Sequence, residues 1–185
     1  MLKLSPLGKI PYIKSDDGYL SESQAILEYL EDAFPANQLY PAKAFERGKC
    51  REFIQHLELN FELIARRLYA EAFLGRTVPH EIKDEVRAKI TAGLTGLARL
   101  MKQSPYALGD RFTAADVVAW SYLQMVSFAT QKIYGQNLVV EYIPGIEAYI
   151  KLMESRLYVQ KVGEGRAAAL TAKLKISEPR EALIK

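Results

Sequence analysis

The feature that most constrains this chain is a proline inside a short extended run near its amino terminus. Residues 10–14 read Ile-Pro-Tyr-Ile-Lys, which favours a β-strand, but Pro11 has no N–H to donate to a ladder. The run is therefore either an edge strand with a trans proline or a special bend with a cis Ile10–Pro11 bond. The next segment, Ser15-Asp16-Asp17-Gly18, predicts a hairpin because Asp-Gly favours tight turns.

A helix is expected directly after the returning strand of this hairpin. Ser21 and Gln24 have the spacing of a capping box, in which two side chains satisfy free N–H groups at the start of a helix. Apolar residues then recur at positions 25, 26, 29 and 30, and Phe34-Pro35 ends the pattern. Strand, hairpin and helix together predict a small α+β unit.

Helical periodicity dominates the remainder of the chain. One apolar stripe runs through positions 50, 53, 54, 57, 61, 64, 65, 68 and 72, and a second through 82, 86, 90, 94, 97 and 101. The expected fold class is α+β followed by all-α, with a partial domain at residues 1–40 and a helical bundle of five or six helices at residues 41–185.

A second capping box is predicted at Thr113 and Asp116. Here a carboxylate stands at the third helical position, where it can accept from the free N–H groups of the first turn. The helix that follows is apolar nearly all the way round, which is typical of a helix at the centre of a bundle. We expect the role of Thr113 and Asp116 to be structural.

Composition excludes several classes of protein and site. The net charge is +3 and the basic residues alternate with acidic ones, so we expect no nucleic-acid partner. No run reaches the roughly 20 apolar residues of a membrane span, and no signal-peptide run follows Met1. The single cysteine, Cys50, fits the buried stripe and a reducing compartment, which predicts a cytoplasmic protein. His56 and His80 lack the spacing of metal ligands, so no metal site is expected.

Two residues at the helix start have the chemistry of an amino-acid binding site. The first turn of a helix favours an anion, so Ser23 there can donate to a ligand carboxylate while Glu22 accepts from an ammonium group. Lys9, beside the proline, can pair with a second carboxylate. The alternatives are an ordinary acidic helix start and a surface lysine.

These segments together resemble the glutathione transferase family. Gly-Lys-Ile-Pro at 8–11, the Asp-Gly hairpin and Leu-Ser-Glu-Ser at 20–23 resemble the second half of its amino-terminal domain. Residues 108–116 resemble the start of the central helix of its all-α domain. The resemblance implies a thioredoxin-like glutathione-binding domain followed by a helical domain, with glutathione as co-substrate, a small electrophile as partner and no tightly bound cofactor.

The resemblance also implies roles for individual residues. Ile10, before a cis Pro11, would pair its backbone with the cysteinyl part of glutathione, and Glu22 and Ser23 would hold the γ-glutamyl end. Lys9 matches a position that reaches the glycyl carboxylate in some classes. Aromatic residues on the long helices, Tyr69, Phe73, Trp120, Tyr122 and Phe128, can line an electrophile pocket or pack in the core. Tyr69 and Phe73 are the expected pocket members.

The chain departs from the family pattern at its amino terminus. The family's thiol-activating Tyr, Ser or Cys would lie before Met1, so we expect no catalytic residue within this sequence and a transferase that is inactive or impaired. A non-catalytic binding or assembly module and a truncated product are the alternatives. The partial domain would expose a strand edge, which predicts self-association or poor order in the first forty residues.

Overall fold

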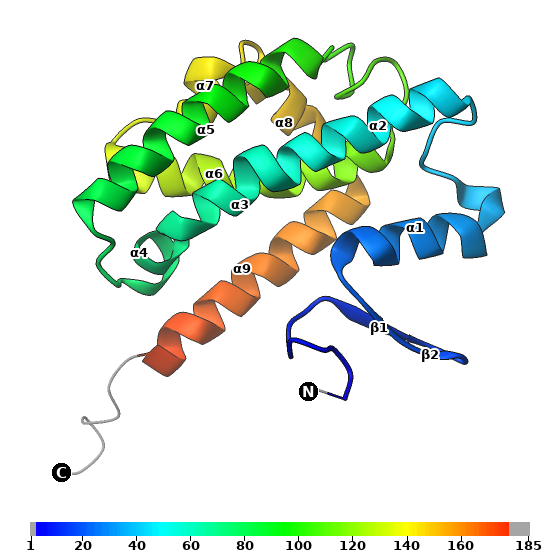
Figure 1. Ribbon diagram of the computed structural model, residues 1–185, viewed down its shortest axis with the longest axis horizontal. Coiled ribbons are helices and arrows are strands. Elements are labelled where there is room, and N and C mark those ends of the chain that lie inside the picture. Colours follow the sequence, from blue (N-terminus) through cyan, green and yellow to red (C-terminus); the bar gives the residue numbers. More distant parts are fainter. Residues whose placement is uncertain (1–2, 178–185) are drawn as a thin grey trace. The chain divides into compact units, whose positions relative to one another are not determined.

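The computed structural model describes residues 3–177, with side chains described for residues 3–169. By their internal contacts the residues form two compact units, Met1–Cys50 and Arg51–Lys185. In Figure 1 the first unit, in blue to cyan, contains the strands β1 and β2 and the helix α1, and the second contains the helices from α3 to α9. Helix α2 (Ala44–Leu57) crosses the boundary between them.

The first unit begins with the predicted hairpin. Strand β1 (Tyr12–Ser15) pairs antiparallel with β2 (Gly18–Ser21), in the register Tyr12↔Ser21 to Ser15↔Gly18. Asp16 and Asp17 form the loop, and Gly18 adopts φ 140°, a conformation that L side chains rarely reach. The hairpin prediction is confirmed. No third described strand joins this sheet, so each of its strands has one open edge.

The capping box predicted at Ser21 and Gln24 is wrong. Ser21 is the last residue of β2, and α1 (Ser23–Ala33) begins two residues later, with Glu22 as its N-cap and no side-chain cap. The Gln24 side chain instead donates to the Tyr40 hydroxyl at 2.8 Å and to Glu28 Oε1 at 3.2 Å. Pairing with β1 holds Ser21 in the strand, and this tertiary constraint overrides the local capping preference.

A buried carboxylate fixes the segment that follows α1. Glu31 is 6% exposed, and its two oxygens accept the backbone N–H groups of Leu39 and Tyr40 at 2.8 and 3.0 Å. A short 3₁₀ helix, η1 (Pro35–Asn37), leads into this segment. The Tyr40 ring is buried, and burial raises the pKa of its hydroxyl far above its usual range, so it stays protonated. These contacts join the linker to α1.

The second unit is all helical. Its elements are η2 (Glu58–Glu62), a π-helical turn; α3 (Leu63–Ala65); η3 (Arg66–Leu68), a 3₁₀ turn; α4 (Tyr69–Leu74); α5 (His80–Leu100); α6 (Ala114–Tyr134); α7 (Leu138–Tyr142); α8 (Ile146–Glu154); and α9 (Leu157–Ser177). The first apolar stripe, predicted as one sustained helix, is therefore divided among α2, η2, α3, η3 and α4. Its members, Cys50 among them, are still mostly buried, because π and 3₁₀ turns shift the helical face only slightly.

The widened turn η2 lies against a glycine of α5. A Cβ atom on Gly93 would collide with the backbone carbonyl oxygen of Asn60, which belongs to η2. Three residues on, Gly96 has open space at the same position. The close approach of the two helical segments therefore requires a residue without a side chain at position 93.

The capping box predicted at Thr113 and Asp116 is present at the start of α6. Asp116 is fully buried, and its Oδ2 accepts the Thr113 N–H at 2.8 Å and the Thr113 hydroxyl at 3.1 Å. Its Oδ1 accepts the Ala107 N–H at 2.7 Å and the Tyr149 hydroxyl at 3.1 Å. One carboxylate thus ties together the preceding loop, α6 and α8.

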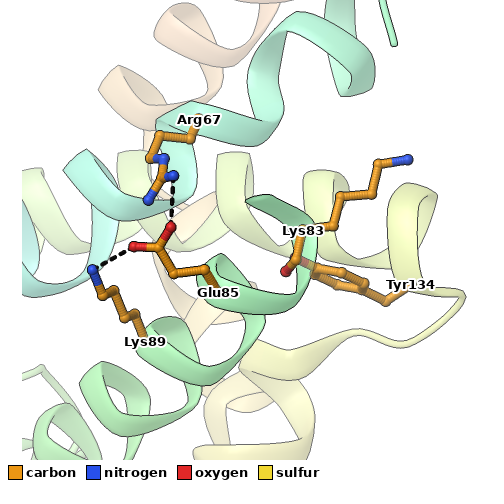
Figure 2. Close-up of polar contacts among 5 residues, drawn as sticks. All are labelled: Arg67, Lys83, Glu85, Lys89 and Tyr134. Atoms are coloured by element: carbon orange, nitrogen blue, oxygen red, sulfur yellow. Dashed lines mark hydrogen bonds and ion pairs between the residues drawn. The ribbon is translucent and has the colours of Figure 1, made fainter. Parts of the chain in front are cut away.

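Polar contacts at the start of α5 add to the packing of the second unit (Figure 2). Glu85 lies between two cations, with Arg67 Nη2 2.8 Å from Oε2 and Lys89 Nζ 2.6 Å from Oε1. The hydrogen bonds from Arg67 and then Lys89 lower the pKa of Glu85 to about 2. The Tyr134 hydroxyl donates to the carbonyl of Lys83 at 2.7 Å, which joins the end of α6 to α5.

The close approach at Gly93 is tested by two matched substitutions. Gly93→Ala is expected to lower the free energy of unfolding by about 2 kcal/mol, because the methyl group forces α5 and η2 apart. Gly96→Ala, on the same helix, is expected to raise it by about 0.5 kcal/mol or more, since alanine favours a helix where space allows. Urea denaturation followed by circular dichroism measures both, and equal effects of the two substitutions would contradict the close approach.

The buried carboxylate of Asp116 is tested in the same way. Asp116→Ala leaves two backbone N–H groups and two hydroxyls without their acceptor, so we expect a loss of about 3 kcal/mol or more in the free energy of unfolding. Tyr149→Phe removes one of these hydrogen bonds and should cost about 1 kcal/mol. A loss no larger for Asp116→Ala than for Tyr149→Phe would refute the central role of this carboxylate.

Candidate functional site

The first candidate site begins at a turn that precedes β1. The Ser5 carbonyl accepts the Gly8 N–H at 2.9 Å, and the buried Ser5 hydroxyl accepts the Lys9 N–H at 3.2 Å. The turn leads into the Ile10–Pro11 bond. This bond is cis, which was one of the two alternatives predicted from the sequence. Lys9 and Pro11 are exposed, and the side chain of Ile10 is 76% exposed. This exposed segment leads directly into β1, which begins at Tyr12.

The second part of this site is the start of α1. Glu22 adopts φ 72° and ψ 122°, a region that a residue with a Cβ atom rarely occupies and that costs about 1–3 kcal/mol. Glu22 and Ser23 are exposed, and no side chain caps the helix. The free N–H groups of the first turn are therefore open to a ligand, and the helix dipole favours an anion there.

The hairpin register brings the two parts together. Pro11 directly precedes Tyr12 and Glu22 directly follows Ser21, and Tyr12 and Ser21 are paired. Because the strands are antiparallel, the proline bend and the helix start lie at the same end of the hairpin. The structure therefore places the five predicted residues, Lys9, Ile10, Pro11, Glu22 and Ser23, in two adjacent exposed segments.

A second candidate site is a cavity within the second unit, which we call the α4–α6–α9 cavity. Its volume is about 260 Å³. The residues that line it are Ala72 and Phe73 of α4, Gln124, Met125, Phe128 and Lys132 of α6, and Arg166 of α9. On α6 the spacing of Gln124, Phe128 and Lys132 is four residues, which puts them on one helical face.

Aromatic rings form one wall of this cavity. The rings of Phe73 and Phe128 stack with centroids 5.0 Å apart and planes 19° apart. Tyr69, the other predicted pocket residue, is not among the lining residues and packs edge-to-face on Phe73 at 5.1 Å. Its hydroxyl is buried with no hydrogen-bond partner, and burial raises the pKa of that hydroxyl well above its usual range.

Four polar or flexible residues of the cavity were not singled out from the sequence. Gln124, Met125, Lys132 and Arg166 carry no motif, and only the packing of α4, α6 and α9 brings them to one place. Phe128, which was not among the expected pocket members and for which core packing was the favoured role, lines the cavity and is 50% exposed. Trp120, in contrast, is 5% exposed and belongs to the core.

Comparison with known proteins gives the family. The family model described as the glutathione S-transferase C-terminal domain matches residues 80–152, and the N-terminal domain model matches residues 1–38. A glutathione S-transferase from Pseudomonas putida is 32% identical over 171 residues, covering 92% of this chain and 77% of that protein. The chain belongs to the glutathione S-transferase family.

Solved structures agree with this assignment. Glutathione S-transferase 1-6 from Anopheles dirus species B has a TM-score of 0.74 at 19% identity, covering 96% of this chain and 80% of that one. Glutathione transferase Omega 3C from Trametes versicolor has a TM-score of 0.70 at 25% identity, covering 85% and 68%. The predicted fold class is confirmed: the hairpin with α1 is part of a thioredoxin-like domain, and an all-α domain of this transferase family follows. Within residues 3–177, no helix combines the length and apolar character that crossing a membrane demands.

The strained backbone at Glu22 gives a prediction for this family member. Glu22→Gly should stabilise the start of α1 by about 1 kcal/mol, because glycine adopts φ 72° without a Cβ penalty. Glu22→Ala, the control, keeps the Cβ atom and should give no such gain. Hydrogen–deuterium exchange of the α1 amides measures the local stability, and equal protection in the two variants would argue against strain at this residue.

Proposed function

We propose that this glutathione S-transferase family member binds glutathione at the hairpin end of its first unit. The proposed site consists of Lys9, Ile10, Pro11, Glu22 and Ser23, within a partial thioredoxin-like domain of residues 1–40. Residues 41–185 form the proposed helical domain. The observation that carries the proposal is the uncapped start of α1, where Glu22 takes a strained conformation beside Ser23. Strain of this kind is concentrated at ligand-binding positions in proteins.

The chemistry of these groups matches the two ends of glutathione. The N–H groups and the Ser23 hydroxyl at the start of α1 are donors for the γ-glutamyl carboxylate, and the Glu22 carboxylate is an acceptor for the adjacent ammonium group. The open edge of β1 offers backbone groups to the extended peptide part, as in the addition of a strand to a sheet. Lys9 supplies a cation for the glycyl carboxylate.

The proposed reaction is transfer of glutathione to an electrophile held in the α4–α6–α9 cavity. The proposed contribution of this chain's residues is to bind and orient each reactant, since orientation lowers the barrier of a transfer reaction. We assign no described residue to activation of the glutathione thiol. Cys50 is fully buried in the first unit and is not proposed as a nucleophile. The protein is proposed to act in the cytoplasm and to self-associate through the exposed edge of the sheet.

Calorimetry with glutathione tests the binding part of this proposal. We expect the wild-type chain to bind glutathione, and Ser23→Ala to bind it about tenfold more weakly, because one hydrogen bond to a charged group is lost. Ser155→Ala is the matched control, since the Ser155 hydroxyl donates only to a backbone carbonyl in the second unit. Undetectable binding by a folded wild-type chain, or equal affinities of the Ser23 and Ser155 variants, would refute the site.

A second measurement separates binding from transfer. S-methylglutathione keeps both ends of the tripeptide and has no free thiol, so it should bind with an affinity similar to that of glutathione. Conjugation of glutathione to 1-chloro-2,4-dinitrobenzene, followed by absorbance, then shows whether a chain that binds glutathione also transfers it. Binding without conjugation would assign this chain to the non-catalytic binding class of the family.

A further inference from the structure

Among residues 3–169, whose side chains are described, the lining of the α4–α6–α9 cavity has two basic residues and no acidic residue. Lys132 lies toward the end of α6, and Arg166 extends from α9. The remaining lining residues are apolar except for Gln124, which is uncharged. An apolar cavity whose only charges are positive attracts an anionic ligand, since a low-dielectric wall strengthens the attraction.

Arg166 has hydrogen-bonding capacity that its contacts with Ser121 and Trp120 leave unused. Its Nη2 donates to the Ser121 hydroxyl at 3.3 Å, and its guanidinium carbon lies 4.7 Å from the centre of the Trp120 ring. Among residues 3–169, whose side chains are described, none places a carboxylate within ion-pairing distance of it. A guanidinium has five N–H donors in a planar fork, which matches the two oxygens of a carboxylate.

The surroundings of Arg166 favour a bound anion. Its side chain is partly buried, and this burial lowers the pKa of the guanidinium, because a charge loses hydration there. Buried charges in proteins are normally paired. A ligand carboxylate would supply the ion-pair partner that the side chains of residues 3–169 do not provide.

Lys132, the second cation of the cavity, has different surroundings from Arg166. Its ammonium group donates to the carbonyl of Ala72 at 2.9 Å and lies 5.8 Å from the centre of the Phe128 ring. These contacts join the end of α4 to α6, and the residue is exposed. Arg166 is the better anchor for a ligand carboxylate, because it is less exposed than Lys132 and carries the planar fork that a lysine lacks.

The aromatic wall fits the other part of such a ligand. Phe73 and Phe128 present stacked rings, and Met125 adds a flexible apolar side chain. A cavity of about 260 Å³ has room for one aromatic ring with a short side arm. We infer that this cavity takes a small aromatic electrophile bearing a carboxylate, which pairs with Arg166 while the ring packs against Phe73 and Phe128. The inference rests on the proposed transferase function, because it names the class of its electrophile.

A matched pair of small ligands tests this inference on the wild-type chain. 4-Nitrocinnamate carries a carboxylate, and 4-nitrocinnamamide has the same shape without the charge. Both quench tryptophan fluorescence, and Trp120 is the only tryptophan of the sequence and lies beside Arg166. We expect the carboxylate to bind at least about tenfold more tightly than the amide, since a charge-assisted hydrogen bond is lost with the amide.

Four variants locate the group that recognises the charge. Arg166→Gln should reduce the preference to within about twofold, and Arg166→Lys should retain part of it, because the charge remains but the planar fork is lost. Lys132→Gln should leave the preference largely unchanged. Arg156→Gln is the matched control, since Arg156 also stacks on an aromatic ring, 3.9 Å from the centre of Phe112, and does not line the cavity. Circular dichroism checks that each variant is folded.

The outcomes separate this inference from the proposed function. Equal binding of the two ligands to the wild-type chain overturns the inference without any variant, as does a preference that persists in folded Arg166→Gln or is lost in Lys132→Gln. The titrations contain no glutathione, so a failure of glutathione binding in calorimetry leaves their result intact. A carboxylate preference that depends on Arg166 supports the inference even if glutathione does not bind.

Discussion

The structure of the second unit depends on one buried carboxylate. Asp116 receives hydrogen bonds from the loop before α6, from the N-cap of α6 and from Tyr149 of α8, and it is shielded completely from water. An ionisable group in such a place is tolerated only when its hydrogen bonds are satisfied, so the three segments have to meet at one point. Because α6 also supplies four lining residues of the α4–α6–α9 cavity, the same carboxylate fixes the start of the helix that carries this wall.

The first unit uses a different constraint, the register of a two-stranded hairpin. A slip of one residue would separate the proline bend from the start of α1 and would turn each strand's side chains to the opposite face. The strained conformation of Glu22 is the local consequence, since the chain passes from Ser21 in a strand to Ser23 in a helix with a single residue between them. This strain lowers stability at the residue that we propose for binding the ammonium group of glutathione.

The cavity combines stacked aromatic rings with an arginine that forms no ion pair with any side chain of the described part of the chain, residues 3–169. In the binding mode that we infer, Phe73 and Phe128 provide a surface for a flat ring. Arg166 orients the carboxylate, because a guanidinium donates its paired hydrogen bonds in one plane. Members of one enzyme fold differ in substrate through side chains of this kind rather than through the fold itself.

The structural features that could be predicted from the sequence alone are those formed by residues close together in the chain. The Asp-Gly hairpin and the Thr113–Asp116 box were predictable because their interacting residues lie within a few positions of one another. The same local reasoning failed at Ser21, where pairing with Tyr12 of β1 overrode the capping preference. The tertiary structure alone decided the composition of the cavity. Phe73 was expected from the family resemblance, but Lys132 and Arg166 carry no motif. They lie far apart in the sequence, and only the packing of the helices brings their side chains to one cavity.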